Sequence, residues 1–185
     1  MKKRLIATSL LSIGAIALIA SCKSIPRGAK PVNNFDPKRY LGNWYEIARL
    51  DFKYEKNLNN TMAHYSLKDN GDIKVLNSGY NYKKQEWTSS IGNAKFRGDQ
   101  SEAALKVSFF GPFYSGYNVI ALDDQYQYAL VAGKNTDYLW ILSREKTIPD
   151  VVKQQYLKIA SDIGYNTADL VWVEHNMDNP TANWK

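Results

Sequence analysis

The side chains that could do chemistry are few and widely spaced in this chain. Cys22 is the only cysteine, so no intramolecular disulfide is possible, and the two histidines, His64 and His175, stand in no metal-ligand spacing. The sequence contains no Gly-x-Ser-x-Gly turn and no glycine-rich phosphate loop. We interpret the adjacent Asp123 and Asp124 as a turn rather than as a catalytic carboxylate pair. We therefore expect neither an enzyme nor a protein that carries a metal or cofactor.

The cysteine lies in a segment whose composition is typical of a secretory signal. Three basic residues at 2–4 precede an apolar run, Leu5 to Ala20, that is too short and too near the terminus for a membrane span. Its end, Ile19-Ala20-Ser21-Cys22, resembles the lipobox of bacterial lipoproteins, in which the chain is cut before a cysteine that takes a diacylglycerol and acyl chains such as palmitate. The resemblance implies a cleaved signal peptide at 1–21 and lipidation of Cys22. The alternative is a buried free cysteine.

Residues 22–34 have the composition of a tether between that lipid and a domain at 35–185. Pro26, Gly28 and Pro31 interrupt any periodicity there. Lys23, rather than Asp, follows the cysteine, which by the same resemblance implies a lipid-anchored protein of the bacterial outer membrane that faces the periplasm. Cleavage would leave 164 of the 185 residues, enough for one domain with a substantial core.

The charge of the chain indicates no nucleic-acid partner. The formal net charge is +6, with 24 basic and 18 acidic residues, and it falls to about +3 without the three basic residues of the signal. The remaining charges are scattered and form no run of one sign. An ordinary solvated surface explains them, and a weak attraction to anionic lipid head groups is the alternative.

The elements that must carry the remaining side chains are mostly β-strands. Asn70-Gly71 is a strong hairpin signal, Gly92 indicates a bulge or bend within its strand, and the charged stretch 51–60 indicates a large loop. Eight strands is the number at which an antiparallel up-and-down barrel closes around one small ligand. The predicted strands are 42–50, 61–67, 73–80, 86–96, 104–110, 117–122, 126–132 and 138–143.

The periodicity changes after these strands. Residues 147–150 contain Thr, an early Pro and an acid, which predicts a helix start. Apolar residues then recur on one helical stripe, and Gly164 suits the C-terminal cap. We expect this helix to lie against the outside of the sheet; membrane binding by the stripe is the alternative. A short edge strand at 170–173 and a loose tail should follow. The stripe consists of Val152, Tyr156, Ile159 and Ile163.

Three motifs and several longer stretches resemble the lipocalins. Gly42-x-Trp44 opens the first strand, Asp123-x-x-Tyr126 precedes the seventh, and Arg144 follows the eighth. The threonine of the second motif is replaced here, since Leu122 precedes the two aspartates. The stretches 33–36, 39–49, 106–113 and 138–144 are similar to the bacterial subgroup in particular. The resemblance covers the chain after the signal.

The resemblance implies an all-β fold, an eight-stranded antiparallel up-and-down barrel with one C-terminal α-helix packed outside. It also implies that Gly42, Trp44, Tyr126 and Arg144 are structural. The tryptophan would close the narrow end of the barrel and the arginine would lie across it, because a guanidinium stacks well on an aromatic face.

Strand alternation then predicts which residues face a ligand. An outward Lys106 places Val107 and Phe109 inside, and an outward Lys74 places Val75 and Asn77 inside. For 117–122, either set of alternate residues could face inward. A loop at 110–115 should line the open end of the barrel. Each aromatic residue could instead simply fill the barrel. The predicted ligand-binding residues are Tyr65, Val75, Asn77, Val107, Phe109, Phe110, Phe113, Tyr114, Tyr138 and Trp140.

Such a lining suits an amphiphile. About ten buried methylenes at ~0.8 kcal/mol each contribute ~8 kcal/mol, which corresponds to roughly micromolar binding before other costs. The resemblance implies a membrane-anchored protein that binds and stores or transfers fatty acids, phospholipids or lysophospholipids in the cell envelope. A lipid-modifying enzyme on the same barrel and a structural lipoprotein without a ligand are the alternatives. Its partners would be the lipid ligand and the membrane, and both monomer and homodimer remain open.

Overall fold

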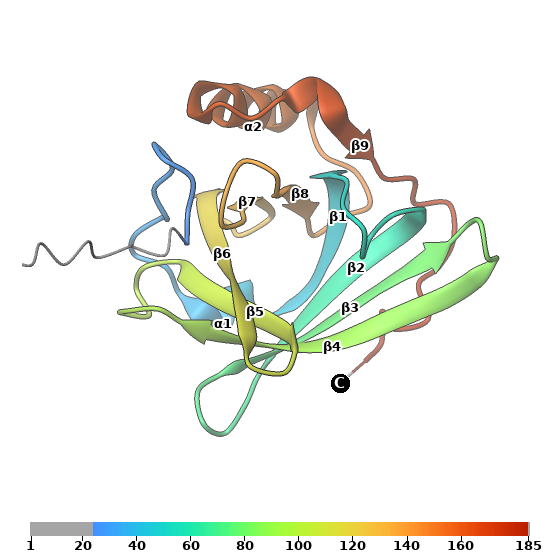
Figure 1. Ribbon diagram of the computed structural model, residues 1–185, viewed down its shortest axis with the longest axis horizontal. Helices are drawn as coiled ribbons and strands as arrows, with labels where there is room; N and C mark the ends of the chain where they lie inside the picture. Colours follow the sequence, from blue (N-terminus) through green and yellow to red (C-terminus); the bar gives the residue numbers. More distant parts are fainter. Residues whose placement is uncertain (1–23, 185) are drawn as a thin grey trace, which may run out of the picture.

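The protein is a single barrel with one long helix outside it (Figure 1). The computed structural model describes residues 24–184. The strand order is β2-β3-β4-β5-β6-β7-β8-β1, and a further pairing of β1 with β2 closes the ring. The barrel strands are β1 (Gly42–Leu50), β2 (Leu58–Leu67), β3 (Ile73–Asn81), β4 (Glu86–Phe96), β5 (Ala104–Phe110), β6 (Phe113–Leu122), β7 (Tyr128–Ala132) and β8 (Leu139–Ser143). The other elements are α1 (Pro37–Tyr40), α2 (Asp150–Ile163), η1 (Thr167–Asp169) and β9 (Leu170–Trp172), which pairs with the end of β1.

The predicted fold class is confirmed, and most strand boundaries agree with the prediction within a few residues. The clearest error concerns the loop expected at 110–115. Phe110 pairs with Phe113, so β5 and β6 form a tight hairpin in which Gly111 has a φ of 57°. A left-handed residue in such a turn favours glycine. Residues 113–115 are therefore strand residues whose side chains alternate, rather than loop residues that all surround the open end of the barrel.

Gly92 lies at a close approach between strands, and of the bulge or bend predicted there, a bulge is absent from its pairing with β3. The β3–β4 ladder runs without a register shift through the pair Val75 and Gly92. A Cβ atom at Gly92 would come within 2.8 Å of the Phe109 ring and 2.9 Å of the Ser108 carbonyl oxygen. The glycine thus leaves room for an inward phenylalanine from the neighbouring strand.

The barrel sheet carries a core on each face. Side chains inside the barrel, from Trp44 to Leu142, form one apolar cluster. Outward residues of β1, β7 and β8 form a second cluster beneath α2, which Figure 1 shows across that side of the barrel. Tyr156 and Ala160 are its most buried helical residues. The predicted stripe therefore packs on the sheet, which leaves the membrane-binding alternative without its apolar face.

The ends of α2 agree only in part with the prediction. Gly164 adopts the left-handed conformation (φ 102°) and caps the C-terminus as expected. The helix begins at Asp150 with Pro149 at its N-cap and no side-chain cap. The carbonyl of Thr147 instead accepts a hydrogen bond from the Ser143 hydroxyl at 2.9 Å, so this threonine belongs to the preceding loop.

Both terminal segments lie against the barrel. The Asn179 side chain is 6% exposed and donates to the Asn60 carbonyl oxygen (3.0 Å) and to the Ser78 hydroxyl (2.9 Å), so the expectation of a loose tail is wrong for its described part. Within the expected tether, Val32 donates to the Val119 carbonyl oxygen and accepts from the Ala103 amide. Cys22 and the signal segment lie outside the described residues. Between residues 24 and 184, no helix has the length and apolar character needed to cross a membrane.

Candidate ligand-binding cavity

A cavity of ≈ 390 Å³ occupies the interior of the barrel. A volume in this range suits a small ligand. The cavity reaches the end of the barrel that carries the β1–β2 loop, the β5–β6 turn and the β7–β8 loop. It is lined there by Tyr54 and Lys134 from the two loops and by Phe113, the first residue of β6. Phe110 and Phe113 are 60% and 81% exposed there. We call this end the mouth.

The opposite end is closed by Trp44 and Arg144. Trp44 is fully buried, its ring packs 4.8 Å from the Tyr40 ring, and its indole N–H donates to the Tyr40 carbonyl oxygen at 2.8 Å. The Arg144 guanidinium lies 3.9 Å above the Trp44 ring. It also donates to the backbone carbonyl oxygens of Asn43 (2.6 Å), Arg39 (2.9 Å) and Tyr126 (3.2 Å). The arrangement expected for these two residues from the resemblance is present.

Gly42 and Tyr126 complete this closure. Gly42 has a φ of 90°, and a Cβ atom there would lie 3.6 Å from an Arg144 nitrogen. Tyr126 has a φ of 58°, its hydroxyl accepts a hydrogen bond from the Asp36 amide at 2.8 Å, and the Arg39 guanidinium lies 4.1 Å above its ring. These contacts fasten the chain before β1 to the β6–β7 turn. Neither residue lines the cavity.

The structure brings together all but one of the predicted ligand-binding residues. Tyr114 is the exception: it follows Phe113 in β6, so its side chain points to the outside, where the Lys106 ammonium lies 5.2 Å from its ring. The inward positions at the start of β6 are Phe113, Ser115 and Tyr117, and Val119 continues this alternation. The register then shifts, so Ile120 and Ala121 both belong to the outer core and Leu122 returns to the inside. The predicted residues that line the cavity are Tyr65, Val75, Asn77, Val107, Phe109, Phe110, Phe113, Tyr138 and Trp140.

Three aromatic rings form one wall of the cavity near the mouth. The Tyr138 and Trp140 rings stack at 6.3 Å, and the Phe52 ring packs edge-on against both, at 5.5 Å and 5.9 Å. All three side chains line the cavity. We refer to Phe52, Tyr138 and Trp140 as the aromatic wall.

Three tyrosine hydroxyls lie deeper in the barrel. The Tyr117 hydroxyl is 2.8 Å from those of Tyr40 and Tyr65, and all three residues line the cavity. Burial raises the pKa of each hydroxyl, so all three are neutral at physiological pH. The lower cavity therefore offers neutral hydrogen-bonding groups within an apolar surface.

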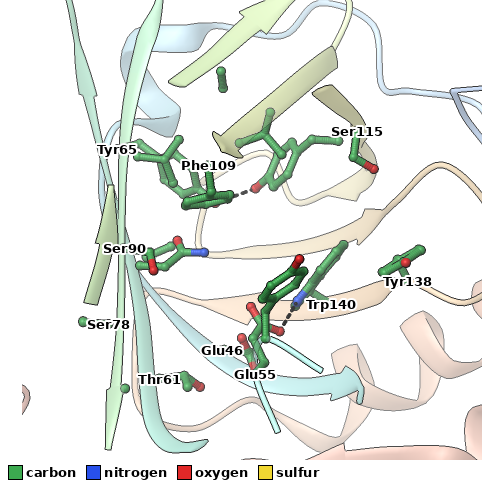
Figure 2. A pocket seen from close by; sticks show the side chains of 18 of the residues that line it. Glu46, Glu55, Thr61, Tyr65, Ser78, Ser90, Phe109, Ser115, Tyr138 and Trp140 are labelled. Atoms are coloured by element: carbon green, nitrogen blue, oxygen red, sulfur yellow. Dashed lines mark hydrogen bonds between the residues drawn. The ribbon is translucent and has the colours of Figure 1, made fainter. Parts of the chain in front are cut away.

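A buried charged cluster beneath the aromatic wall was not predicted from the sequence. The Arg49 guanidinium, 1% exposed, bonds the carboxylates of Glu46 at 2.7 Å and Asp51 at 3.1 Å. It also donates to the backbone carbonyl oxygens of Glu55 and Leu58. The Glu55 carboxyl lies 4.0 Å from Arg49 and accepts a hydrogen bond from the Trp140 indole at 3.0 Å (Figure 2). Glu46 and Glu55 line the cavity.

Burial and neighbouring charges together shift the pKa values of Glu55 and Glu46. Burial, followed by the nearby Glu46 carboxylate, raises the pKa of Glu55 to about 8, against the smaller opposing effects of Trp140 and Arg49. Burial also raises the pKa of Glu46, although Arg49 opposes this shift. Glu55 is thus mostly protonated at neutral pH, which limits the net charge in the wall.

Two further polar atoms in the wall are incompletely paired. The Asn77 amide oxygen is buried without a hydrogen-bond partner in the described part of the chain. The Thr61 hydroxyl is also buried; it interacts with the Glu46 carboxyl, but not in the geometry of a full hydrogen bond. Both residues line the cavity, and Thr61 is 4% exposed. Buried polar atoms without partners are uncommon in folded proteins, so a ligand atom or water would be expected to reach them. Residues 24–184 contain no group of three or more side chains that could hold a metal ion.

The chain is similar to known proteins in sequence and in fold. A family model described as a lipocalin-like domain matches residues 35–175. The outer membrane lipoprotein Blc of Citrobacter freundii is 54% identical over 165 residues, which cover 88% of this chain and 93% of that protein. The protein of the same name from Escherichia coli (strain K12) is 54% identical over 162 residues, covering 86% and 92%. The structure of insecticyanin from the tobacco hornworm Manduca sexta superposes with a TM-score of 0.63 over 83% of this chain and 86% of that one; at 23% identity this likeness concerns the fold alone.

Proposed function

This chain belongs to the lipocalin family and is an outer membrane lipoprotein, and on that premise we propose that its barrel binds fatty acids, phospholipids or lysophospholipids and stores or transfers them in the cell envelope. The observation that carries the proposal is the shape of the barrel interior. One end is sealed by Trp44 and Arg144, while the other ends in exposed Phe110 and Phe113. An apolar cavity with a single mouth suits an acyl chain that enters tail first.

The amphiphilic character of the lining favours a ligand with one apolar and one polar end. Deep positions such as Val75, Leu105 and Val107 are aliphatic, whereas the ionisable side chains of Glu46, Glu55 and Lys134 lie nearer the mouth. Burial of apolar surface would supply most of the affinity, at ~0.8 kcal/mol for each methylene removed from water. Few directional contacts are needed for such binding, so we expect tolerance of chain length and unsaturation.

We further propose that the mature chain is anchored through lipid on Cys22 and faces the periplasm. Several acyl chains, at about 0.8 kcal/mol for each buried methylene, make a durable anchor. An anchored barrel would stay near the bilayer that supplies its ligand. We also propose binding without turnover, because the cavity lining of the described chain contains no cysteine or histidine, and its Glu46 carboxyl is paired with Arg49 rather than available as a base.

Titration of the purified mature domain with a fluorescent fatty acid tests the proposal directly. We expect saturable binding, at one site per barrel, that unlabelled lysophospholipid displaces. Mass spectrometry of the displaced lipid should recover it chemically unchanged. Absence of saturable binding by either lipid would favour the structural lipoprotein, and time-dependent cleavage of the lipid would favour an enzyme.

A further inference from the structure

The cavity wall presents a carboxyl group that is only weakly paired with a cation. Arg49 directs its guanidinium to Glu46 and Asp51 and to two backbone carbonyl oxygens. The Glu55 carboxyl is left 4.0 Å from that guanidinium, and its hydrogen-bond donor is the neutral Trp140 indole at 3.0 Å. Three carboxyl groups thus share one buried guanidinium, and the least compensated of them lines the cavity.

The surroundings of this carboxyl group also suit a cation. The aromatic wall of Phe52, Tyr138 and Trp140 borders the same part of the cavity, and aromatic faces attract ammonium groups. The Thr61 hydroxyl, which is buried beside the Glu46 carboxyl, lines the cavity on the same side as Glu46 and Glu55 (Figure 2). A hydroxyl oxygen can accept a hydrogen bond from an ammonium N–H.

We propose that Glu55, together with Glu46 and the aromatic wall, forms a subsite for the ammonium group of a single-chain amphiphile whose tail fills the barrel. The inference rests on the lipid-binding function proposed above and narrows its ligand class. A carboxylate at the same depth would face Glu46 and Glu55 and would be repelled by Glu55 once that carboxyl ionises. A neutral head group would gain only hydrogen bonds there.

In the described chain, no basic side chain near the cavity mouth supplies a buried cation for the Glu55 carboxyl. Lys134 is the one basic residue on the cavity lining among residues 24–184, and it is exposed, with its ammonium 5.9 Å from the Tyr138 ring. Lys53 is also exposed, and its ammonium lies 4.6 Å from the Tyr54 ring. Solvent screens exposed charges. Both lysines could interact with an anionic group of the same ligand outside the mouth.

The protonation of Glu55 makes the subsite measurable. With a pKa of about 8, this carboxyl is about 90% protonated at pH 7. A bound ammonium group favours the ionised form, so binding must release close to one proton at that pH. Affinity for the ammonium amphiphile should therefore rise up to about tenfold for each pH unit between about pH 6 and pH 8, and then level off.

The experiment compares dodecylamine, dodecanol and dodecanoate, below their micellar concentrations, by isothermal titration calorimetry in buffers of different ionisation enthalpy. These probes share a chain and differ in head-group charge. We expect dodecylammonium to bind about tenfold or more tightly than dodecanol at about pH 8 and to release about 0.9 proton at pH 7. Dodecanol should show little pH dependence, and dodecanoate should bind less tightly as the pH rises.

Two variants separate the subsite from general effects of charge. Glu55→Gln should reduce dodecylammonium affinity to that of dodecanol and abolish proton release, while dodecanol affinity shows that the fold is intact. Asp51→Asn is the matched control, because Asp51 bonds the same Arg49 but does not line the cavity; this variant should keep the preference. Equal affinity of the wild type for dodecylammonium and dodecanol, or a preference that survives Glu55→Gln, would overturn the subsite and leave lipid binding standing. Failure of all three probes to bind would overturn the proposed function itself.

Discussion

Replacing Arg144 with Met should destabilise the barrel without weakening ligand binding. The side chain donates three charge-assisted hydrogen bonds, to the carbonyl oxygens of Tyr126, Asn43 and Arg39, and stacks 3.9 Å above Trp44. Methionine keeps similar length and apolar contact but removes the donors and the charge. The variant therefore isolates the polar part of the closure.

The loss of folding stability expected for Arg144→Met can be worked out from these contacts. The bond to Arg39 is exposed and contributes little, while the two partly buried bonds are worth about 1 kcal/mol each after exchange with water. The guanidinium above the indole adds about 1 kcal/mol. The expected loss of about 3 kcal/mol is a large part of a typical stability of about 5–15 kcal/mol. It should lower Tm by about 6–12 °C for a domain of this size.

Arg39→Met is the matched control. Arg39 also stacks on an aromatic ring, at 4.1 Å from the Tyr126 centroid, and donates one hydrogen bond to the Asp124 carbonyl oxygen, but in an exposed position. It should cost about 1 kcal/mol, or about 2–4 °C in Tm. Thermal unfolding by circular dichroism gives both values, and fluorescent fatty acid affinity should stay within about twofold of wild type in each. Equal losses in the two variants, or a loss of ligand affinity confined to Arg144→Met, would refute the division into closed and open ends.

Three other predictions concern the mouth, the charged cluster and the anchor. Trp140→Ala should weaken alkyl-chain binding by about 10–100-fold, since it removes a large apolar contact, whereas Trp87→Ala, outside the cavity, should change it little; a fluorescence titration of both variants decides. Because the folded pKa of Glu55, about 8, lies above its ordinary 4.5, the stability it contributes should decline as pH rises from about 4.5 to 8, by up to ~1.4 kcal/mol per unit; denaturant unfolding of Glu55→Gln should show a flatter profile. Cys22→Ala should yield soluble periplasmic protein or unprocessed precursor, and a normally lipidated membrane protein would contradict the lipobox interpretation.

The closed end of the barrel could be predicted from the sequence because its parts are short local patterns. Gly42-x-Trp44 and Arg144 are fixed to the ends of the first and last barrel strands. Where strand alternation is regular, it also placed Val75, Asn77, Val107 and Phe109 correctly on the cavity lining. Tyr114 was misplaced because a loop was assumed where the β5–β6 hairpin continues the alternation. The buried Asn179 could not be predicted, since its contacts with Asn60 and Ser78 join residues about a hundred positions apart.

The charged cluster escaped prediction for a different reason, which lies in β1. The pairing of β1 with β8 shifts register between Glu46 and Ala48. In a regular strand, residues three apart face opposite sides, so Glu46 and Arg49 would be separated by the sheet. The irregularity instead places Ile47 and Ala48 in the outer core beneath α2 and returns Arg49 to the inside, 2.7 Å from Glu46.

The same irregularity therefore serves both faces of β1. It supplies two neighbouring apolar residues to the helix and brings a guanidinium beneath the cavity wall, where it holds Glu46 and the Glu55 backbone. The Glu55 backbone is fixed in this way while its carboxyl stays outside strong pairing with Arg49, at 4.0 Å. A loop residue thus acquires a defined position at the mouth, with a perturbed carboxyl facing the cavity. The ligand selectivity that we propose for the open end would follow from this one departure from regular alternation, whereas the closed end follows from its motifs.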